Sequence, residues 1–263
     1  MIPVTAIIPT YNEEDCILNA IESVQFADEI LVVDSYSTDE TIKLAKSKGA
    51  KIIQREYHYS ASQKNWAIPQ AKHPWIILID ADEMVSEELK AEIHSILESE
   101  PKESGFFIYR KNYFLGREIN YSGWQKDKVI RLFKRDECSY QDRHVHAEIV
   151  SSGRIGYLKH KIIHNTYKNI KHYLSKIERY AEWKSKDHEE KMDSLSAWHF
   201  MLRPPLRFFK HYLLKLGFLD GFPGLVIAAL QSYEVFLRYI NLLRARLEKE
   251  ERENKLNDQS PNT

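Results

Sequence analysis

The chain has 263 residues, 43% hydrophobic and 29% charged, a composition typical of a globular protein with one large domain or a domain and an appendage. Its formal net charge of zero disfavours a nucleic-acid-binding protein that relies on a basic field. The zero conceals an asymmetry, because residues 1–150 carry a net charge of −7 and residues 151–250 a net charge of +8. The two halves are therefore expected to present different surfaces to different partners.

Cysteine usage and apolar runs limit where the protein can reside. Cys16 and Cys138 are the two cysteines of the sequence, so no disulfide framework is expected and a reducing compartment is favoured. The opening stretch MIPVTAIIPT lacks the basic and long apolar regions of a signal peptide. No run of about 18 uncharged apolar residues occurs, so no membrane-spanning helix is expected. These features favour a cytoplasmic location.

Short apolar runs alternate with helical patterns over the first hundred residues. The runs predict strands at 4–8, 29–34, 51–54 and 75–80. The helical patterns predict a helix at 12–26 capped by Asn12-Glu13-Glu14, one capped by Ser37, Thr38 or Asp39 that stops at Gly49, one at 60–71 with a break near Pro69, and one capped by Ser86 that runs to residue 98. Four such units in succession indicate an α/β fold with a doubly wound, mostly parallel sheet. Ligands of such sheets bind beyond the carboxyl ends of the strands.

The pattern changes after residue 100. Strands are predicted at 105–114 and 128–135, and a charged helix at 170–191. The segment 199–243 is aromatic, basic and helical, with breaks at Pro204-Pro205 and 217–224. We therefore expect an α/β domain over 1–165, a helical, amphipathic region over 166–250 and a disordered tail over 251–263.

Three carboxylates stand together at the end of the fourth strand, in IILIDADEM. Asp80, Asp82 and Glu83 should repel one another and raise one another's pKa values. Acids at a helix N-terminus are the simpler explanation, but Glu87 and Glu88 already fill that place beside Ser86. A divalent cation, Mg²⁺ or Mn²⁺, that carries the phosphates of a nucleotide would neutralise the cluster.

Polar residues also follow the other strands of this half. Thr10 and Tyr11 come directly after the first strand, where a nucleobase could pack on the tyrosine ring. Asp34 ends the second strand, where its carboxylate could accept a hydrogen bond from a base imide N–H or a ribose hydroxyl. It could also be a helix cap. Lys64 could place a cation near phosphate, although a lone lysine is more often solvated surface. The sequence contains neither G-x-G-x-x-G nor G-x-x-x-x-G-K-[ST], which argues against dinucleotide and P-loop chemistry.

Four motifs in this order and spacing resemble the family 2 glycosyltransferases, which have the GT-A fold: PTYNEE, VVDSYSTDET, QKNWA and LIDADE. Three later segments resemble the branch named for lipopolysaccharide-core β-glucosyltransferases: SGWQKDKVIRLFKR, HNTYKNIKHYLSK and LLKLGFLDGFPGLVIAALQSYEVFLRY. The resemblance implies an inverting, metal-assisted transfer from a nucleotide sugar to an acceptor hydroxyl. It implies that Lys64 lies near the sugar or diphosphate, Asp80 meets the ribose or metal and Asp82 binds the metal, with the nucleoside held by Thr10, Tyr11, Glu13 and Asp34.

The general base is predicted less directly. The branch often has a histidine followed at once by an acid after the RLF strand, but DRHVHAEI has Ala147 between His146 and Glu148. In a strand this shift would turn Glu148 to the opposite face. Glu148 is the first candidate, with Asp142 and Asp127 behind it. His146 is the candidate hydrogen-bond partner of a ligand and His164 the candidate metal ligand, although a lone histidine is more often structural.

The segment 199–243 has two interpretations. Its apolar residues alternate with Arg203, Arg207, Lys210 and Lys215, as in an amphipathic element that lies on an anionic membrane surface. The alternative is a helical pair packed on the catalytic domain or on a second subunit. We favour membrane contact, because lipid-linked acceptors are usual in the branch that the sequence resembles.

The predicted function is a glycosyltransferase that moves a sugar, with a UDP-sugar favoured, to a lipopolysaccharide-core or other surface-glycan acceptor. It would work at the inner face of the cytoplasmic membrane, with no nucleic-acid partner. Transfer to a protein or a polyprenyl phosphate is the alternative reaction. A nucleotide-sugar-binding protein without turnover and a nucleotidyltransferase, which would form a diphosphate, are the rivals from other classes.

Overall fold

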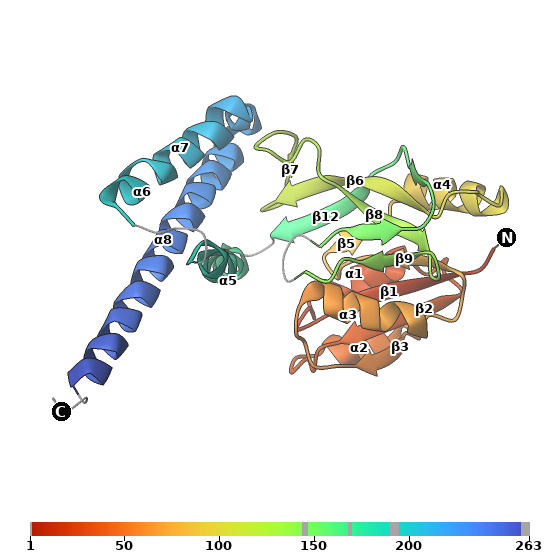
Figure 1. Cartoon of the computed structure of the whole chain (residues 1–263). Helices are drawn as coiled ribbons and strands as arrows, with labels where there is room; N and C mark the ends of the chain where they lie inside the picture. The colour runs from red at the N-terminus through yellow and green to blue at the C-terminus, as the bar shows by residue number, and fades with distance from the viewer. Residues whose placement is uncertain (1, 144–146, 168–169, 190–194, 259–263) are drawn as a thin grey trace. The chain divides into compact units, whose positions relative to one another are not determined.

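The computed structural model describes residues 2–143, 147–167, 170–189 and 195–258 (Figure 1). The chain forms two compact units. The first comprises Met1–Tyr113 and Lys126–Thr166, and the second comprises Phe114–Gln125 and Tyr167–Thr263. The segment 114–125 therefore groups with the helical part of the chain, although it was predicted to belong to the α/β domain over 1–165. The division into independent domains at 165/166 stays a prediction.

The first unit is built on one sheet whose strands follow the order β3-β2-β1-β4-β8-β6-β12-β5. One half is parallel: β3 Lys51–Gln54, β2 Glu29–Asp34, β1 Val4–Thr10 and β4 Trp75–Leu78. In the other half β8 Lys128–Lys134 runs antiparallel to β4 and to β6 Gly105–Phe114, and β12 Ile162–Tyr167 runs antiparallel to β5 Glu83–Met84. The expected α/β fold with a mostly parallel sheet and a helical C-terminal region is confirmed.

Three further short strands complete this unit. β11 Ile155–Tyr157 pairs in parallel with β6. β9 Cys138–Tyr140 and β10 Ile149–Ser151 form a separate antiparallel pair.

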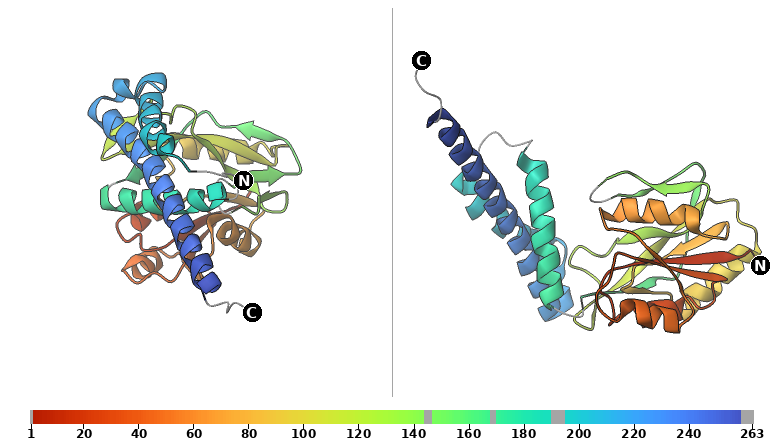
Figure 2. Two further views of the ribbon diagram at one scale, coloured as in Figure 1. Left: turned by 60° about the vertical axis from the view of Figure 1, so that its left-hand side comes forward. Right: turned by 90° about the horizontal axis from the view of Figure 1, so that it is seen from below.

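Helices cover both faces of the parallel half (Figures 1 and 2). α1 Ile17–Ser23, α2 Thr41–Ser47 and α4 Glu87–Glu98 contribute to the core that contains Ile8 and Ile77. α3 Ser60–Ala67 and the 3₁₀ turn η1 Ile68–Gln70 belong to the core that contains Ile7 and Ile76. Because both faces are buried, the central strands read as continuous apolar runs in the sequence.

The first helix begins later than the sequence predicts. Asn12 was expected to cap it, but Asn12 has a φ of 53° and its side-chain oxygen accepts the amide of Thr38. The helix therefore begins at Ile17. The predicted cap of α4 is confirmed, because the hydroxyl of Ser86 accepts the amide of Leu89 at 3.2 Å.

The second unit is helical, apart from the short strand β7 Arg117–Ile119. Its helices are α5 Ile170–Glu189, α6 Ala197–Met201, α7 Arg203–Phe209, the π-helical turn η2 Lys210–Leu214, the 3₁₀ turn η3 Gly217–Asp220 and α8 Gly221–Asp258. α5 and α7 pack along α8 (Figure 2). Their core includes Tyr173, Ile177 and Ile227, together with Phe114 and Ile119 from the inserted segment.

The predicted helix breaks have clear physical causes. Pro204 and Pro205 open α7 instead of interrupting it, because the first turn of a helix does not need their missing N–H groups. At Gly224, a Cβ atom would lie 1.8 Å from the carbonyl oxygen of Gly217, so α8 can approach η3 only with glycine there. α8 continues to Asp258, which places helix within the segment predicted to be a disordered tail.

The carboxylate of Asp220 holds the segment 114–125 within the second unit. It accepts the amides of Asn120 and Tyr121 and the hydroxyl of Ser122 at 2.6 Å. The ring of His211, which is also buried, contacts the carbonyl oxygen of Ser122 at 3.0 Å. Burial lowers the pKa of His211, and the nearby basic side chains lower it further.

Candidate active site

The carboxyl ends of the parallel strands bring several of the predicted residues to one edge of the sheet. Thr10 pairs in register with Asp34 across β1 and β2, and Asp80 follows the end of β4. Thr10 is buried, and its hydroxyl has no hydrogen-bond partner among the described residues. Tyr11 has 56% of its surface exposed beside it.

Two loops at this edge are joined by side-chain to backbone hydrogen bonds. The amide of Asn12 donates to the hydroxyl of Ser37 at 2.9 Å, and the amide of Glu13 donates to the hydroxyl of Thr41 at 2.8 Å. The buried carboxylate of Asp34 accepts the amide of Ser37 at 3.1 Å and the side chain of Gln54 at 3.0 Å. The loop that carries Tyr11 and Glu13 is therefore fixed relative to Asp34.

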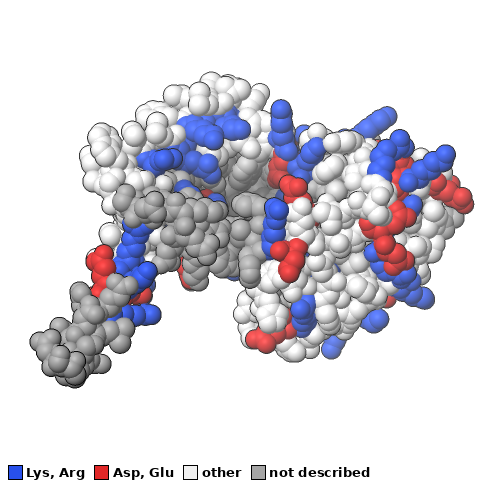
Figure 3. Space-filling view, viewed as in Figure 1, with Lys and Arg blue, Asp and Glu red and all other residues white. Residues whose placement is uncertain are grey.

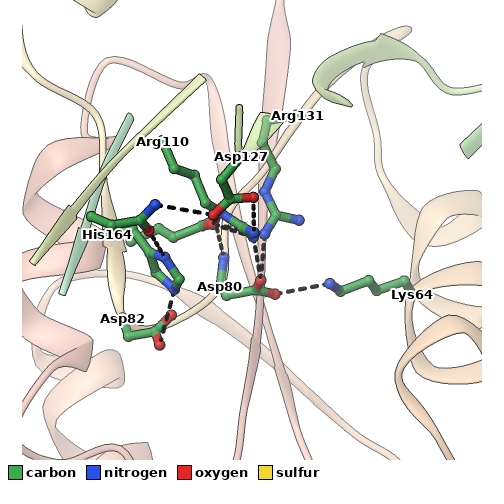
Figure 4. Close-up of polar contacts among 9 residues, drawn as sticks. Lys64, Asp80, Asp82, Arg110, Asp127, Arg131 and His164 are labelled. Carbon is green, nitrogen blue, oxygen red and sulfur yellow. Dashed lines mark hydrogen bonds and ion pairs between the residues drawn. The ribbon is translucent and has the colours of Figure 1, made fainter. Parts of the chain in front are cut away.

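A cluster of opposite charges surrounds the acidic motif (Figure 4). Asp80 binds the Nζ atom of Lys64 at 2.9 Å and the guanidinium of Arg131. Glu83, which is completely buried, binds Arg110 at 2.7 Å and Arg131 at 2.8 Å. Arg131 and Lys64 are also buried, so this is an interior charge network and not a solvated surface.

These contacts determine the protonation of the two acids. Burial alone would raise the pKa of Glu83, but the charges of Arg131 and Arg110 outweigh burial and lower that pKa to about 2. Burial opposes ionisation of Asp80 in the same way, and Arg131, Lys64 and Arg110 hold its pKa well below the usual range. Both side chains are therefore carboxylates at neutral pH.

The structure corrects the physical reason that the sequence analysis gave for a metal. A divalent cation was predicted to neutralise the repelling carboxylates of DADE. In the structure, the side chains of Arg110, Arg131 and Lys64 already neutralise Asp80 and Glu83. Lys64 was expected near a sugar or diphosphate, and in the structure it binds Asp80. Asp82 is the carboxylate of the motif that pairs with none of these three cations, so it is the candidate metal ligand.

Backbone pairing brings Asp82 next to His164. β5 and β12 pair so that His164 lies opposite Glu83, and the amide of Asn165 donates to the carbonyl oxygen of Asp82 at 2.9 Å. The Nε2 atom of His164 is 3.5 Å from Oδ2 of Asp82 (Figure 4). The other ring nitrogen, Nδ1, lies 2.7 Å from Oδ1 of Asn112.

The pair Asp82–His164 fits a divalent cation. Two ligands about 2.1 Å from one ion and at roughly a right angle are about 3 Å apart, so both atoms can bind the same ion after a small shift. Among the described residues, no group of three or more His, Cys, Asp and Glu side chains could hold a metal. A metal here would take the rest of its ligands from water or from a phosphate-bearing ligand, as Mg²⁺ usually does.

The three candidate bases lie in different surroundings. Asp127 accepts hydrogen bonds from Asn112 at 3.1 Å and Arg110 at 3.4 Å, close to the charge network. Asp142 is exposed and accepts the hydroxyl of Tyr59. Glu148 is exposed just before β10, and His146 lies outside the described residues.

No role was predicted for Arg110, Asn112 or Arg131, and Glu83 was predicted only to belong to the acid cluster. A signal for Arg131 was present, because an arginine within the apolar run KVIRLFK is rarely buried without an acidic partner. Arg110 and Asn112 are two residues apart in β6, so they share one face of that strand. Their partners could not be read from the sequence, because these depend on how the strands are ordered in the sheet.

Comparison with known proteins identifies the family of the chain. The model of the glycosyl transferase family 2 matches residues 5–151, more than half of the chain. The chain belongs to glycosyl transferase family 2. It is therefore a glycosyltransferase, and the family resemblance predicted from the motifs PTYNEE, VVDSYSTDET, QKNWA and LIDADE is confirmed.

Relatives cover nearly all of this glycosyltransferase. An uncharacterised glycosyltransferase of Rickettsia typhi is 29% identical over 256 residues, which cover 91% of this chain and 86% of the relative. The lipopolysaccharide core biosynthesis glycosyltransferase LpsC of Rhizobium meliloti is 26% identical over 252 residues, which cover 90% of this chain and 93% of the relative. Among solved structures, glucosyl-3-phosphoglycerate synthase of Mycobacterium tuberculosis is 21% identical over 43% of this chain and 44% of that chain, with a TM-score of 0.36.

We predict that Glu83→Gln destabilises the glycosyltransferase by about 3–5 kcal/mol at neutral pH, because it leaves two buried guanidinium groups short of an acidic partner. The pKa of Glu83 is lowered from 4.5 to about 2, so its ionised form stabilises the fold fully above about pH 4.5. That contribution is lost as the pH falls toward 2, and the difference between wild type and variant should shrink over this range. Urea denaturation across the pH series measures it.

Glu87→Gln is the matched control for this prediction, because the Glu87 side chain is 85% exposed in its pair with Lys90. Its stability should stay close to that of wild type at every pH. Equal stability of Glu83→Gln and Glu87→Gln at neutral pH would show that the buried network does not need Glu83.

Proposed function

We propose that the glycosyltransferase transfers a sugar with inversion from a UDP-sugar to a hydroxyl group of a lipopolysaccharide-core or other surface-glycan acceptor. The observation that carries the proposal is the pair Asp82–His164 beside the Asp80–Lys64 ion pair, at the carboxyl edge of a parallel sheet. The likeness to LpsC over most of both chains supports the acceptor class.

The nucleoside would bind at the ends of β1 and β2. An unsatisfied buried hydroxyl costs free energy, and a ligand that reaches Thr10 would supply the missing hydrogen bond. The exposed ring of Tyr11 offers a face on which a base can stack. Asp34 and Glu13 would complete the nucleoside site from the two joined loops.

Asp82 and His164 would hold Mg²⁺ or Mn²⁺, and Asp80 would lie beside the ion or the ribose. The bound ion would neutralise the leaving diphosphate as the bond between the sugar and phosphate breaks. Lys64 and Arg131 surround Asp80 and would keep it ionised and oriented while the donor binds. The new bond forms between the acceptor oxygen and the anomeric carbon, and the nucleoside diphosphate leaves.

The hydroxyl proton of the acceptor needs a base on the face opposite the leaving group. We propose Glu148 for this role. Asp142 is engaged by Tyr59, and Asp127 by Arg110 and Asn112, so each of the other two candidates already accepts hydrogen bonds within the protein.

The second unit would bring the enzyme to a membrane surface that carries the acceptor. No single helix among the described residues is long and apolar enough to span a membrane, although the bent pair Ala197–Leu214 and Gly217–Arg252 meets the criteria of length and composition. The end formed by α6, α7 and the start of α8 exposes many apolar side chains: Trp198, Met201, Leu206, Phe209, Leu214 and Phe222. Figure 3 shows Lys and Arg among uncharged side chains over this end.

Charge supports an anionic lipid surface as the partner. Between residues 197 and 226, Asp220 is the one acid, and its carboxylate accepts hydrogen bonds from 120–122. The basic side chains Arg203, Lys210 and Lys215 are exposed in the same stretch. An apolar face with basic groups and almost no acids is the pattern of helices that lie in the headgroup layer. We propose the inner face of the cytoplasmic membrane as its location.

Two other functions remain testable alternatives. Transfer to a protein or a polyprenyl phosphate would use the same donor site with another acceptor. Binding of a nucleotide sugar without turnover would leave the metal and nucleoside sites in use but release no nucleoside diphosphate.

The first test of the proposed function is a donor screen. UDP-sugars with Mn²⁺ should raise the melting temperature of the wild-type protein, because binding stabilises the folded state. Donor and acceptor together should release UDP and form a glycoside of inverted anomeric configuration.

The Asp82→Asn variant tests the metal ligand. Its binding of UDP, measured by calorimetry, should no longer depend on metal, while its far-UV spectrum stays unchanged. Unchanged metal dependence in this variant would contradict the assignment of Asp82, and donor binding with no product would favour the binding-only alternative.

The second test concerns the base. At saturating donor and metal, Glu148→Gln should lower turnover about 10²–10⁴-fold with little change in donor affinity, because a base acts on the acceptor proton. Asp142→Asn and Asp127→Asn are measured beside it, and the largest loss of turnover should belong to Glu148→Gln. If one of the other variants loses the most, the base is that residue.

The third test concerns the membrane. The wild-type protein should float with vesicles that contain phosphatidylglycerol, and changing Arg203, Arg207, Lys210 and Lys215 together to serine should weaken binding, at about 1 kcal/mol for each charge. The loss should be smaller at high salt, where the charges are screened. The matched control removes four basic residues from the other end of α8: Arg244, Arg246, Lys249 and Arg252. Equal flotation of all three proteins would favour the packed-helix interpretation.

A further inference from the structure

A line of hydrogen-bonding side chains connects Asp127 to Asp82 through the interior of the sheet. Nδ2 of Asn112 is 3.1 Å from Oδ2 of Asp127, and Oδ1 of Asn112 is 2.7 Å from Nδ1 of His164. Nε2 of His164 is 3.5 Å from Oδ2 of Asp82. Asn112 is 2% exposed and His164 8%, so water has little access to the middle of this line.

The chemistry of these groups determines where the protons lie. A carboxylate only accepts hydrogen bonds, so the side chain of Asn112 must turn its NH₂ group toward Asp127. The oxygen of Asn112 then faces His164, and an oxygen can only accept from Nδ1–H. In its neutral form His164 therefore carries its proton on Nδ1 and a lone pair on Nε2.

In this tautomer two hydrogen-bond acceptors face each other, Nε2 of His164 and Oδ2 of Asp82. The lone pair of Nε2 and the carboxylate of Asp82 cannot hydrogen-bond without a proton or a cation between them. A ligating histidine that donates its other N–H to an oxygen is the usual arrangement at metal sites, where the second hydrogen bond sets the tautomer.

We infer that Asn112, oriented by Asp127, is a positioning residue that accepts the Nδ1–H of His164 and so directs Nε2 toward Asp82, where both atoms can bind one divalent cation. This inference rests on the metal site of the proposed function. It gives Asp127 a role other than that of a base. Asn112 lies in β6 and His164 in β12, which are neighbouring strands, so the sheet itself maintains the contact.

The experiment measures Mn²⁺ binding to the full-length protein by electron paramagnetic resonance, without donor or acceptor. Asn112→Leu removes the acceptor for Nδ1–H and should weaken Mn²⁺ binding about 10–100-fold, the usual effect of losing such a partner. His164→Ala gives the Mn²⁺ affinity of a site that has lost one metal ligand. Circular dichroism and the melting temperature establish that each variant is folded.

A double substitution separates the hydrogen-bond pattern from a general effect on packing. Asn112→Asp with Asp127→Asn exchanges the two side chains, keeps the net charge and again offers Nδ1–H an acceptor whose orientation is fixed by its neighbour. Mn²⁺ affinity should return to within a few-fold of wild type. An equally weak double variant, or an Asn112→Leu variant that binds Mn²⁺ as wild type does, would overturn the inference.

The tautomer can also be observed directly in the metal-free protein. Long-range ¹H–¹⁵N spectra should show a proton on Nδ1 of His164 in wild type and in the exchanged variant, and loss of that Nδ1 proton from the neutral ring in Asn112→Leu. An Nδ1 atom of His164 that carries no proton in wild type would contradict the inference whatever the metal affinity. Wild-type protein that binds neither Mn²⁺ nor UDP would contradict the proposed function, and the inference with it. Wild-type protein that binds both but carries no proton on Nδ1 of His164 would contradict the inference alone.

Discussion

The interior of the catalytic unit depends on the compensation of buried charge. Glu83 has no contact with solvent, and it is held by two guanidinium groups that come from different strands of the antiparallel half of the sheet. Buried ions are tolerated only when their partners are in place, so β5, β6 and β8 must assemble in one register to satisfy Glu83, Arg110 and Arg131 together. The candidate site depends on the same register, because Arg131 also binds Asp80.

The network divides the acidic motif into parts with different partners. Asp80 and Glu83 face cations of the protein, and Asp82 faces an imidazole on the opposite side. A motif that reads in sequence as one patch of repelling carboxylates is therefore two separate electrostatic environments. Within this motif, Asp82 is the one carboxylate that forms no ion pair with lysine or arginine among the described residues, which limits how many ligands the motif itself could offer a cation.

Much of the fold was predictable because periodicity is local. The strands of the parallel half and the two long antiparallel strands were located from their apolar runs, and Ser86 was recognised as a cap because its hydrogen bond is local. The prediction that Asn12 caps the first helix was wrong, because its side-chain oxygen accepts the amide of Thr38 from the next loop.

The site was predictable only in part. The strand-end positions of Thr10, Asp34 and Asp80 follow from the alternation of strands and helices, whereas the pairing of β5 with β12 does not. A strand of two residues has no periodic signal, and its partner lies far along the chain. Which cations balance Asp80 and Glu83 likewise depends on strand order, which composition and spacing do not encode.

The insertion of 114–125 between two strands of the catalytic sheet has a consequence for how the protein can be dissected. This segment buries Phe114 and Ile119 against helices of the second unit, and the carboxylate of Asp220 holds its backbone. A fragment that ends near residue 166 would keep the inserted segment but lose every helix that covers it. Exposed aromatic and aliphatic surface would then sit on a loop joined directly to β6 and β8. A soluble catalytic fragment would require the loop to be shortened together with the C-terminal truncation.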